Sequence, residues 1–316
     1  MAIRSSLLTL AAVSALFVFS LTGCQTSPKR ETPGKPGTDI EEVPAPRPSK
    51  EAPSPPRREE AKKVAVILGP GGAKAMAHAG VLKSFQQQRI PVSKIVGLEW
   101  GALIGALYAT KGQAHDVEWK LYKMEQKNLP LSKRGLFSRN SLGEDSVRVM
   151  DGFLSESFQK EEIAGAKIEF ACPSRSVWTG VVSWQTRGPF TEAVRRCLPY
   201  PPIFKIQGSF IGDASQAVGA VERLTNEGYS VIILVDVLGS AQPVGKDSLL
   251  ENLNHVILWQ EVKRAVLQAT HLKVDTVNVN TSGFSGIQFQ ARKELIRLGE
   301  RAGQSAAKDL ISKYGF

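Results

Sequence analysis

From residue 63 onward, short unbroken apolar runs alternate with longer segments whose apolar residues recur at helical spacing. The clearest of the apolar runs are Val64–Leu68 and Val231–Asp236. An unbroken apolar run is typical of a strand that is buried on both faces of a parallel sheet. Strands that alternate with helices along the chain predict a layered α/β domain with a largely parallel sheet.

The same pattern predicts where the elements lie. Strands are expected at 64–68, 95–97, 167–172, 180–184, 210–213, 231–236 and 274–279. Helices are expected at 76–88, 100–109, 117–124, 190–197, 249–272 and 292–314. The predicted domain, residues 63–316, has about 250 residues, which is enough for one large hydrophobic core.

The N-terminus has the composition of an export signal. Arg4 supplies a positive charge, Leu7–Leu21 is apolar, and small residues precede Cys24. This combination defines a secretory signal peptide rather than a membrane span, so residues 1–24 are predicted to be one. Leu21-Thr22-Gly23-Cys24 also resembles a bacterial lipobox, which implies cleavage there and lipidation of Cys24. An ordinary signal peptide with a chance cysteine is the alternative.

The residue after Cys24 is Gln25 rather than Asp. By resemblance to the bacterial sorting rule, this favours the outer membrane over the inner one. The expected location is therefore the bacterial cell envelope, on the periplasmic face or the surface of the outer membrane. The expected partner is a membrane, reached through the lipid on Cys24.

Residues 25–62 have the composition of a tether. Half of the 18 prolines fall between Pro28 and Pro56, and no apolar run occurs there. Such a segment cannot bury enough surface to offset the entropy that it would lose on ordering. At about 3.1 Å per residue, it would reach roughly 100 Å if it were fully extended.

The chain is basic, with 40 Lys and Arg against 30 Asp and Glu. The part from residue 63 onward holds 31 of the basic and 23 of the acidic residues, so it carries +8 of the net charge of +10. A basic domain held near a membrane is drawn to anionic lipid headgroups. A basic surface that serves only solubility explains the same count equally well. No nucleic-acid partner is expected.

Besides Cys24, the cysteines are Cys172 and Cys197. An exported protein is able to pair them, but the expectation is two buried free thiols, since spacing alone does not decide. The four histidines are scattered, and no group of Cys and His has the spacing of a zinc site. Neither a metal nor a cofactor is expected.

Two glycine-rich turns carry the candidate chemistry. Gly69–Ala75 lies between a predicted strand and a predicted helix, where backbone N–H groups can hold an anion such as the oxyanion of acyl transfer. Further along, Gly97–Gly101 has the G-x-S-x-G layout of a nucleophile elbow, but Glu99 stands at its centre. A glycine loop alone is weak evidence, whereas a glycine loop followed by an elbow is far more specific.

These motifs resemble those of the patatin-like phospholipase family. Gly69–Leu82 is similar to the family pattern G-G-G-x-R/K-G-x-x-H-x-G-V-L, and Val96–Ala109 is similar to its elbow, with Glu in place of Ser. Further matches follow in order at Arg134–Ser138, Gly188–Phe204 and Phe210–Ala214. The resemblance covers residues 63–238. It implies a three-layer α/β/α fold with a largely parallel central sheet, and a hydrolase fold that acts on acyl esters of lipids.

The family uses a Ser–Asp dyad and takes its glycine loop as the oxyanion hole. Carried over by position, Glu99 stands for the serine and Asp213 for the aspartate. The oxyanion loop corresponds to Gly71, Gly72, Ala73 and Lys74. By the same comparison, His78 is a structural residue of the following helix.

Three residues depart from the family pattern. The serine is replaced by Glu99, the glycine after the aspartate by Ala214, and a usual glycine of the loop by Ala75. Loss of the nucleophile alone should lower turnover by a factor on the order of 10⁶.

Several interpretations of Glu99 remain open. Its carboxylate could occupy the oxyanion hole as a built-in ligand, favoured by the helix N-terminus and by Lys74 and opposed by the like charge of Asp213. Simple drift after the chemistry was lost explains the residue equally well. Another serine, Ser215 or Ser174, could attack instead, or Glu99 itself could form a mixed anhydride.

The sequence therefore predicts a lipid-anchored pseudoenzyme, an inactive phospholipase homologue that binds a lipid or acyl ligand or a protein partner. The alternative is an active lipid acyl hydrolase with a non-standard nucleophile.

Overall fold

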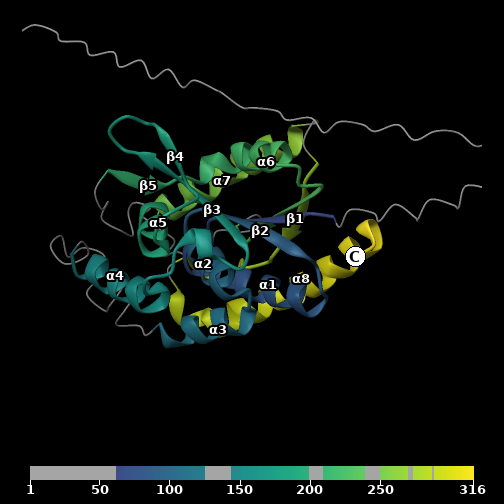
Figure 1. Cartoon of the computed structure of the whole chain (residues 1–316), viewed down its shortest axis with the longest axis horizontal. Coiled ribbons are helices and arrows are strands. Elements are labelled where there is room, and N and C mark those ends of the chain that lie inside the picture. Colours follow the sequence, from purple (N-terminus) through teal and green to yellow (C-terminus); the bar gives the residue numbers. More distant parts are fainter. Residues whose placement is uncertain (1–61, 125–143, 199–208, 239–249, 270–272, 287) are drawn as a thin grey trace, which may run out of the picture. The chain divides into compact units, whose positions relative to one another are not determined.

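A computed structural model describes residues 62–124, 144–198, 209–238, 250–269, 273–286 and 288–316 (Figure 1). They belong to a compact unit that begins at Glu59. Cys24, the tether, Arg134–Ser138 and Pro201–Phe204 lie outside the described residues, so the expectations that depend on them stay predictions.

Seven strands form one sheet in the described part of the chain. They are β1 Val64–Leu68, β2 Val92–Gly97, β3 Glu169–Ser176, β4 Val182–Gln185, β5 Phe210–Gly212, β6 Val231–Asp236 and β7 Asp275–Asn278. Their order is β4-β3-β2-β1-β6-β7, and β5 also pairs with β3. The pairs among β3, β2, β1, β6 and β7 are parallel, whereas β4 and β5 run antiparallel to β3.

Helices cover both faces of this sheet, which gives the three layers of an α/β/α fold (Figure 1). On one face lie α1 Ala77–Gln87, α2 Trp100–Lys111, α3 Ala114–Lys123, α4 Glu144–Phe158, α5 Phe190–Cys197 and α8 Arg292–Tyr314. On the other face lie α6 Ala217–Asn226 and α7 Leu250–Gln268. The predicted fold class is confirmed.

The central strand β1 shows why the apolar runs form this sheet. All five of its residues are buried. Val64, Val66 and Leu68 belong to the core beneath α1, α2 and α8, whereas Ala65 and Ile67 belong to the core beneath α6 and α7. Because successive side chains of a strand point to opposite faces, a strand covered by helices on both sides must be apolar throughout.

Glycines bring α1 and α8 into backbone contact. A Cβ on Gly299 would lie 1.8 Å from the carbonyl oxygen of Ala77, and one on Gly80 would lie 2.0 Å from the backbone of α8. Across the same interface, Ser84 Oγ donates a hydrogen bond of 2.8 Å to the carbonyl of Glu300. Helix α8 therefore supports the helix that directly follows the glycine-rich loop.

Most predicted elements are present with bounds shifted by a few residues, but two helices are additional. Neither α4 nor α6 was expected. Helix α6 does carry a helical pattern, since Ala217, Ala220, Val221 and Leu224 are all buried on one side. The sequence also did not reveal that β4 and β5 reverse direction, because pairing direction is set by the connections and not by the strand composition.

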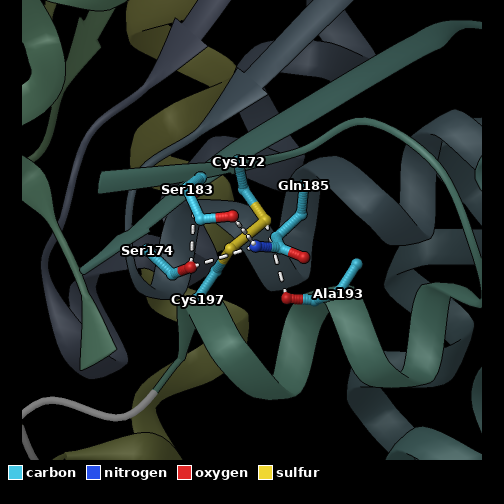
Figure 2. The surroundings of a disulfide bond; sticks show 6 residues. All are labelled: Cys172, Ser174, Ser183, Gln185, Ala193 and Cys197. Carbon is cyan, nitrogen blue, oxygen red and sulfur yellow. Dashed lines mark hydrogen bonds between the residues drawn. A yellow bond between two sulfur atoms is a disulfide. The ribbon is translucent and has the colours of Figure 1, made fainter. Parts of the chain in front are cut away.

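The expectation of two free thiols is wrong, because Cys172 and Cys197 form a disulfide (Figure 2). Their Cα atoms lie 6.3 Å apart, within the range for such bonds. The bond joins β3 to the last residue of α5, and both cysteines are fully buried. Cys172 Sγ also lies 3.7 Å from the carbonyl oxygen of Ala193. The pair could not be inferred from spacing, since it depends on how α5 packs against β3.

Candidate functional site

Glu99 lies in a sharp turn between β2 and α2, in the geometry of a nucleophile elbow. Its backbone has a φ of 51° and a ψ of −118°, a strained combination for any residue other than glycine. A Cβ on Gly97 would lie 2.2 Å from Ala102 Cα, and one on Gly101 would lie 2.3 Å from the carbonyl oxygen of Leu68. Both positions therefore require glycine, as the elbow pattern predicted, and the Glu99 side chain is buried.

Asp213 reaches the same place from the opposite direction. One edge of β3 pairs with β2 as far as Ala171 and with β5 from Ser174 onward, while β4 occupies the other edge. Strands β2 and β5 therefore approach each other end to end, and Glu99 and Asp213 follow their ends. A Cβ on Gly212 would lie 3.1 Å from Glu99 Cγ, so the backbone just before Asp213 packs against the Glu99 side chain.

The Asp213 carboxylate is engaged by two side chains. Arg175 on β3 donates from Nε and Nη2 to Oδ2 at 2.8 and 2.7 Å. Ser215 donates to Oδ1 from its backbone N–H at 3.1 Å and from Oγ at 2.5 Å. Asp213 is almost fully buried, so this pairing compensates much of the cost of placing its charge there. Asp213 and Ser215 were candidates from the sequence, whereas Arg175 lies in no motif that pointed to it.

The disulfide supports this arrangement from one side. A Cβ on Gly212 would lie 2.0 Å from the carbonyl oxygen of Cys197. The end of α5 that is bonded to Cys172 therefore rests directly on the residue between β5 and Asp213. The polar group beside the bond is ordered as well, since Gln185 Nε2 donates to Ser174 Oγ at 3.1 Å (Figure 2).

The glycine-rich loop follows β1 and begins a 3-10 turn, Gly72–Met76, that leads into α1. Gly72 has a φ of +57°, and a Cβ there would lie 2.3 Å from the carbonyl oxygen of Gly286. The same oxygen accepts a hydrogen bond of 2.7 Å from the Ala73 N–H. Two of the four predicted oxyanion-loop residues thus already donate their N–H groups within the chain, because the Lys74 N–H also donates to the carbonyl oxygen of Gly71 at 3.0 Å. No motif in the sequence indicated the contact with Gly286.

Lys74, the cation of the loop, is buried. Burial lowers the pKa of its ammonium group, and the negative charge of Asp236 acts in the opposite direction. Asp236 ends β6, and its Oδ1 accepts from Trp259 Nε1 at 2.8 Å while its Oδ2 accepts from Lys263 Nζ at 2.6 Å. Asp236 is therefore a buried carboxylate near the loop, although in the sequence it only marks the end of an apolar run.

The two alternative serine nucleophiles differ in their surroundings. Ser174 is fully buried, and its Oγ accepts from Gln185 and donates to the carbonyl of Ser183 at 3.3 Å. This pairing favours a structural role. Ser215 is exposed, and its Oγ bonds to Asp213. The latter contact spans two residues at the start of a short 3-10 turn, where Asp213 is the N-cap, a common local arrangement for such side chains.

His78 serves the loop rather than the chemistry. It is fully buried on α1, and its Nε2 donates to the carbonyl oxygen of Gly69 at 2.8 Å. Burial lowers the pKa of the imidazole to about 4, so it is neutral near pH 7. The contact joins the start of α1 to the start of the glycine-rich loop, which is the structural role expected for His78.

Within the described ranges, no three His, Cys, Asp or Glu side chains are grouped so as to hold a metal ion. Among the helices in those ranges, none is both long enough and apolar enough to cross a bilayer.

The fold and the elbow define an α/β protein of the hydrolase type. The family model for patatin-like phospholipase matches residues 66–231. This match covers more than half of the chain, so the chain belongs to the patatin-like phospholipase family.

Curated relatives are similar to part of this chain. Lysophospholipase nte1 of Neurospora crassa is 26% identical over 188 residues, which are 57% of this chain and 12% of that protein. Lysophospholipase NTE1 of Coccidioides immitis is 26% identical over 187 residues, with the same two shares. Patatin-like phospholipase domain-containing protein 6 of Mus musculus is 43% identical over 51 residues, 16% of this chain and 4% of that protein. The chain thus spans about an eighth of the length of the lysophospholipases.

Two solved structures are distantly similar. VipD from Legionella pneumophila has a TM-score of 0.40 and 10% identity, covering 78% of this chain and 67% of that one. ExoU of Pseudomonas aeruginosa, in complex with SpcU, has a TM-score of 0.38 and 12% identity, covering 78% and 52%. At this distance the likenesses have no bearing on function.

Proposed function

We propose that this protein is an exported, lipid-anchored member of the family that has lost acyl hydrolysis and acts by binding a lipid, an acyl chain or a protein partner. The observation that carries the proposal is Glu99 at the centre of the elbow, where the family places its nucleophilic serine. The turn, its two glycines and the neighbouring Asp213 are retained. A carboxylate in this place cannot do the chemistry of a serine hydroxyl.

The surroundings of Asp213 support the same conclusion. In the family's dyad, the aspartate activates the serine. Here both oxygens of Asp213 already accept hydrogen bonds, one from Ser215 and the other from Arg175. An aspartate held in this way acts as a structural ion-pair partner.

The proposal includes the built-in ligand interpretation of Glu99. Glu99 is the N-cap residue of α2 and is buried, a place that favours a negative charge. Its carboxylate would then be directed toward the glycine-rich loop and Lys74. Random drift after loss of the chemistry would also explain Glu99. The two interpretations differ in ligand binding, because a carboxylate in the oxyanion hole would exclude acyl compounds from the site, whereas drift predicts no such exclusion.

The location is part of the proposal. The lipobox-like Cys24 would anchor the chain in the outer membrane, and residues 25–62 would span the distance to the domain. The Cys172–Cys197 disulfide supports export, since such bonds persist in oxidising compartments and are rare in the cytosol.

An esterase assay tests the loss of activity. Purified protein and its Glu99→Ala variant would be compared on short acyl esters and on a lysophospholipid, the substrate class that the relatives' names suggest. Equal rates for the two proteins, at the level of buffer, support the proposal. Turnover by the natural protein above the level of buffer would overturn it, whether or not Glu99→Ala abolishes that turnover.

A second function rests on a separate observation, the hydrogen bond of 2.5 Å from Ser215 Oγ to Asp213. An exposed serine bonded to an aspartate is the minimum of a Ser–Asp dyad, so Ser215 is the candidate nucleophile of an active hydrolase. A fluorophosphonate probe decides between the two functions. Labelling that Ser215→Ala removes would establish this second function, and no labelling under conditions that label a known serine hydrolase would exclude it.

A further inference from the structure

The turn between β3 and β4 presents an apolar tip to solvent. Residues Val177–Val181 form this tip, and Trp178 is 81% exposed, Val181 63% and Val177 37%. A cluster of large apolar side chains with this much solvent exposure indicates a binding surface. In Figure 1 the β3–β4 hairpin lies at the edge of the described domain, away from α3 and α8.

The tip is held rigidly. The Gly180 N–H donates to the carbonyl of Ser176 at 2.9 Å, and the Val177 N–H donates to the carbonyl of Ser209 at 2.8 Å. Arg175 Nη1 donates to the carbonyl of Gly180 at 2.7 Å. Because these contacts already fix the backbone of the turn, binding through Trp178 would cost little further backbone entropy.

Cationic side chains lie beside the tip. Arg175 is the last residue but one of β3, and Arg196 lies 5.2 Å from the ring of Phe210, which pairs with Ser176 at the base of the tip. The exposed carboxylate of Glu192 is 3.9 Å from Arg196, whereas Asp213 is buried. Because Arg175 is paired with Asp213 and Arg196 with Glu192, the attraction to an anionic bilayer comes from the net charge of +8 carried by the residues from 63 onward. The exposed Trp178 adds the preference of tryptophan for the headgroup interface.

We propose that Val177–Val181 docks on the surface of an anionic lipid bilayer, with Trp178 inserted at the headgroup level. The inference rests on the proposed function in one respect, since the lipid anchor at Cys24 would keep a bilayer within reach of the domain. It adds a second point of contact, which would fix the orientation of the domain on the membrane. Arg175 connects this contact to Asp213, since one guanidinium group binds both.

Acyl-chain quenching tests the contact in the full chain. The protein would be reconstituted into phosphatidylglycerol vesicles whose acyl chains are brominated, and tryptophan emission would be recorded. The Trp178→Phe variant would be compared with Trp119→Phe, a matched control because Trp119 is 55% exposed on α3. Of the other three tryptophans, Trp100 and Trp259 are buried beyond reach of the quencher, and Trp184 on β4 is partly buried and common to all three proteins, so it contributes equally to each.

The expected result is quenching of the natural protein that falls at least threefold in Trp178→Phe and is unchanged in Trp119→Phe. The quenching should be severalfold weaker with phosphatidylcholine vesicles or at high salt, because both conditions remove the attraction between the basic domain and anionic headgroups. Equal quenching in all three proteins would overturn the proposal. So would Trp178-dependent self-association in sedimentation without quenching, which would assign the tip to a second copy of the chain.

The outcome is independent of the esterase assay. A protein that hydrolyses esters yet shows Trp178-dependent quenching contradicts the proposed function and supports the docking surface. A protein that is inactive and shows no Trp178-dependent quenching supports the proposed function and contradicts the docking surface.

Discussion

Arg175 holds Asp213 through two N–H groups on a single carboxylate oxygen, at 2.8 and 2.7 Å. The same guanidinium group donates to the carbonyl of Gly180 at 2.7 Å. Asp213 thereby joins the end of β5 to the β3–β4 turn.

Replacement of Arg175 by Ala should destabilise the fold by about 1–3 kcal/mol. Asp213 is buried and would lose its cationic partner, while the partial exposure of Arg175 keeps the loss below that of a fully buried pair. Urea unfolding measures the change. In the double variant Arg175→Ala, Asp213→Asn, much of the loss should be recovered. Additive losses would show that the pair does not contribute to stability.

Replacement of Glu99 by Ser should restore weak nucleophilic character. The turn geometry is already present, so the Glu99→Ser variant should react with a fluorophosphonate probe where Glu99→Ala does not. Esterase activity should remain low because the ion pair with Arg175 still prevents the Asp213 carboxylate from accepting a proton from the new serine. Addition of Arg175→Gln should raise the activity by a factor on the order of 10², the lower end of what a positioned general base contributes. No labelling of any folded Glu99→Ser protein would contradict the assignment of Glu99 to the nucleophile position.

Removal of the disulfide should lower the free energy of unfolding by about 3 kcal/mol, since Cys172 and Cys197 close a loop of 25 residues. The variant with both cysteines replaced by Ala avoids stray thiols. Its loss should equal that of the natural protein measured under a reductant, whereas the variant itself should not respond to reductant. A natural protein that is equally stable with and without reductant would contradict the bond.

Because His78 is buried in its neutral form, the free energy of unfolding should fall in acid. The pKa of His78 is lowered to about 4 by burial, while in the unfolded chain it is about 6.5. The unfolded chain therefore takes up a proton as the pH falls below 6.5, and the folded protein does not do so until about pH 4. The stabilisation is complete above pH 6.5 and is lost toward pH 4, by about 3 kcal/mol in all. Unfolding free energies of the natural protein and of His78→Gln, measured from pH 7 to pH 4, isolate this slope.

Replacement by Ala should have opposite effects on stability at two glycines that lie inside helices. A Cβ on Gly299 would meet the carbonyl oxygen of Ala77 at 1.8 Å, so Gly299→Ala should cost about 3 kcal/mol or prevent folding. A Cβ on Gly152 in α4 would have nothing within 4 Å, so Gly152→Ala should stabilise by about 0.5–1 kcal/mol. Thermal unfolding checks both, and equal effects would contradict the close contact of α1 and α8.

The sequence predicted what depends on local pattern. The apolar run Val64–Leu68, the glycine-bounded turn at Glu99 and the long closing helix all follow from residues adjacent in the chain. The fold class and the family followed from the order of these motifs. The closeness of Glu99 and Asp213 was implied by the family and is accounted for by β2 and β5 meeting along β3.

The remaining features depend on contacts between distant segments. Arg175 bonds to a residue 38 positions away, and Asp236 to a tryptophan 23 positions away. The contact of Gly286 with Ala73 joins two loops that share no motif, and the disulfide depends on how α5 packs. No local periodicity encodes such contacts, since they are fixed only when the sheet and its helices assemble.

The contact between α1 and α8 has a consequence for how the molecule is made. Ser84 and Glu300 are separated by 216 residues, so the support beneath the glycine-rich loop is synthesised long after the loop itself. Until α8 is available, α1 lacks its backbone partner and an apolar surface stays uncovered. The loop therefore acquires its final shape only after α8 has been synthesised, and a chain that stops before α8 would be a target for proteolysis rather than a smaller working protein.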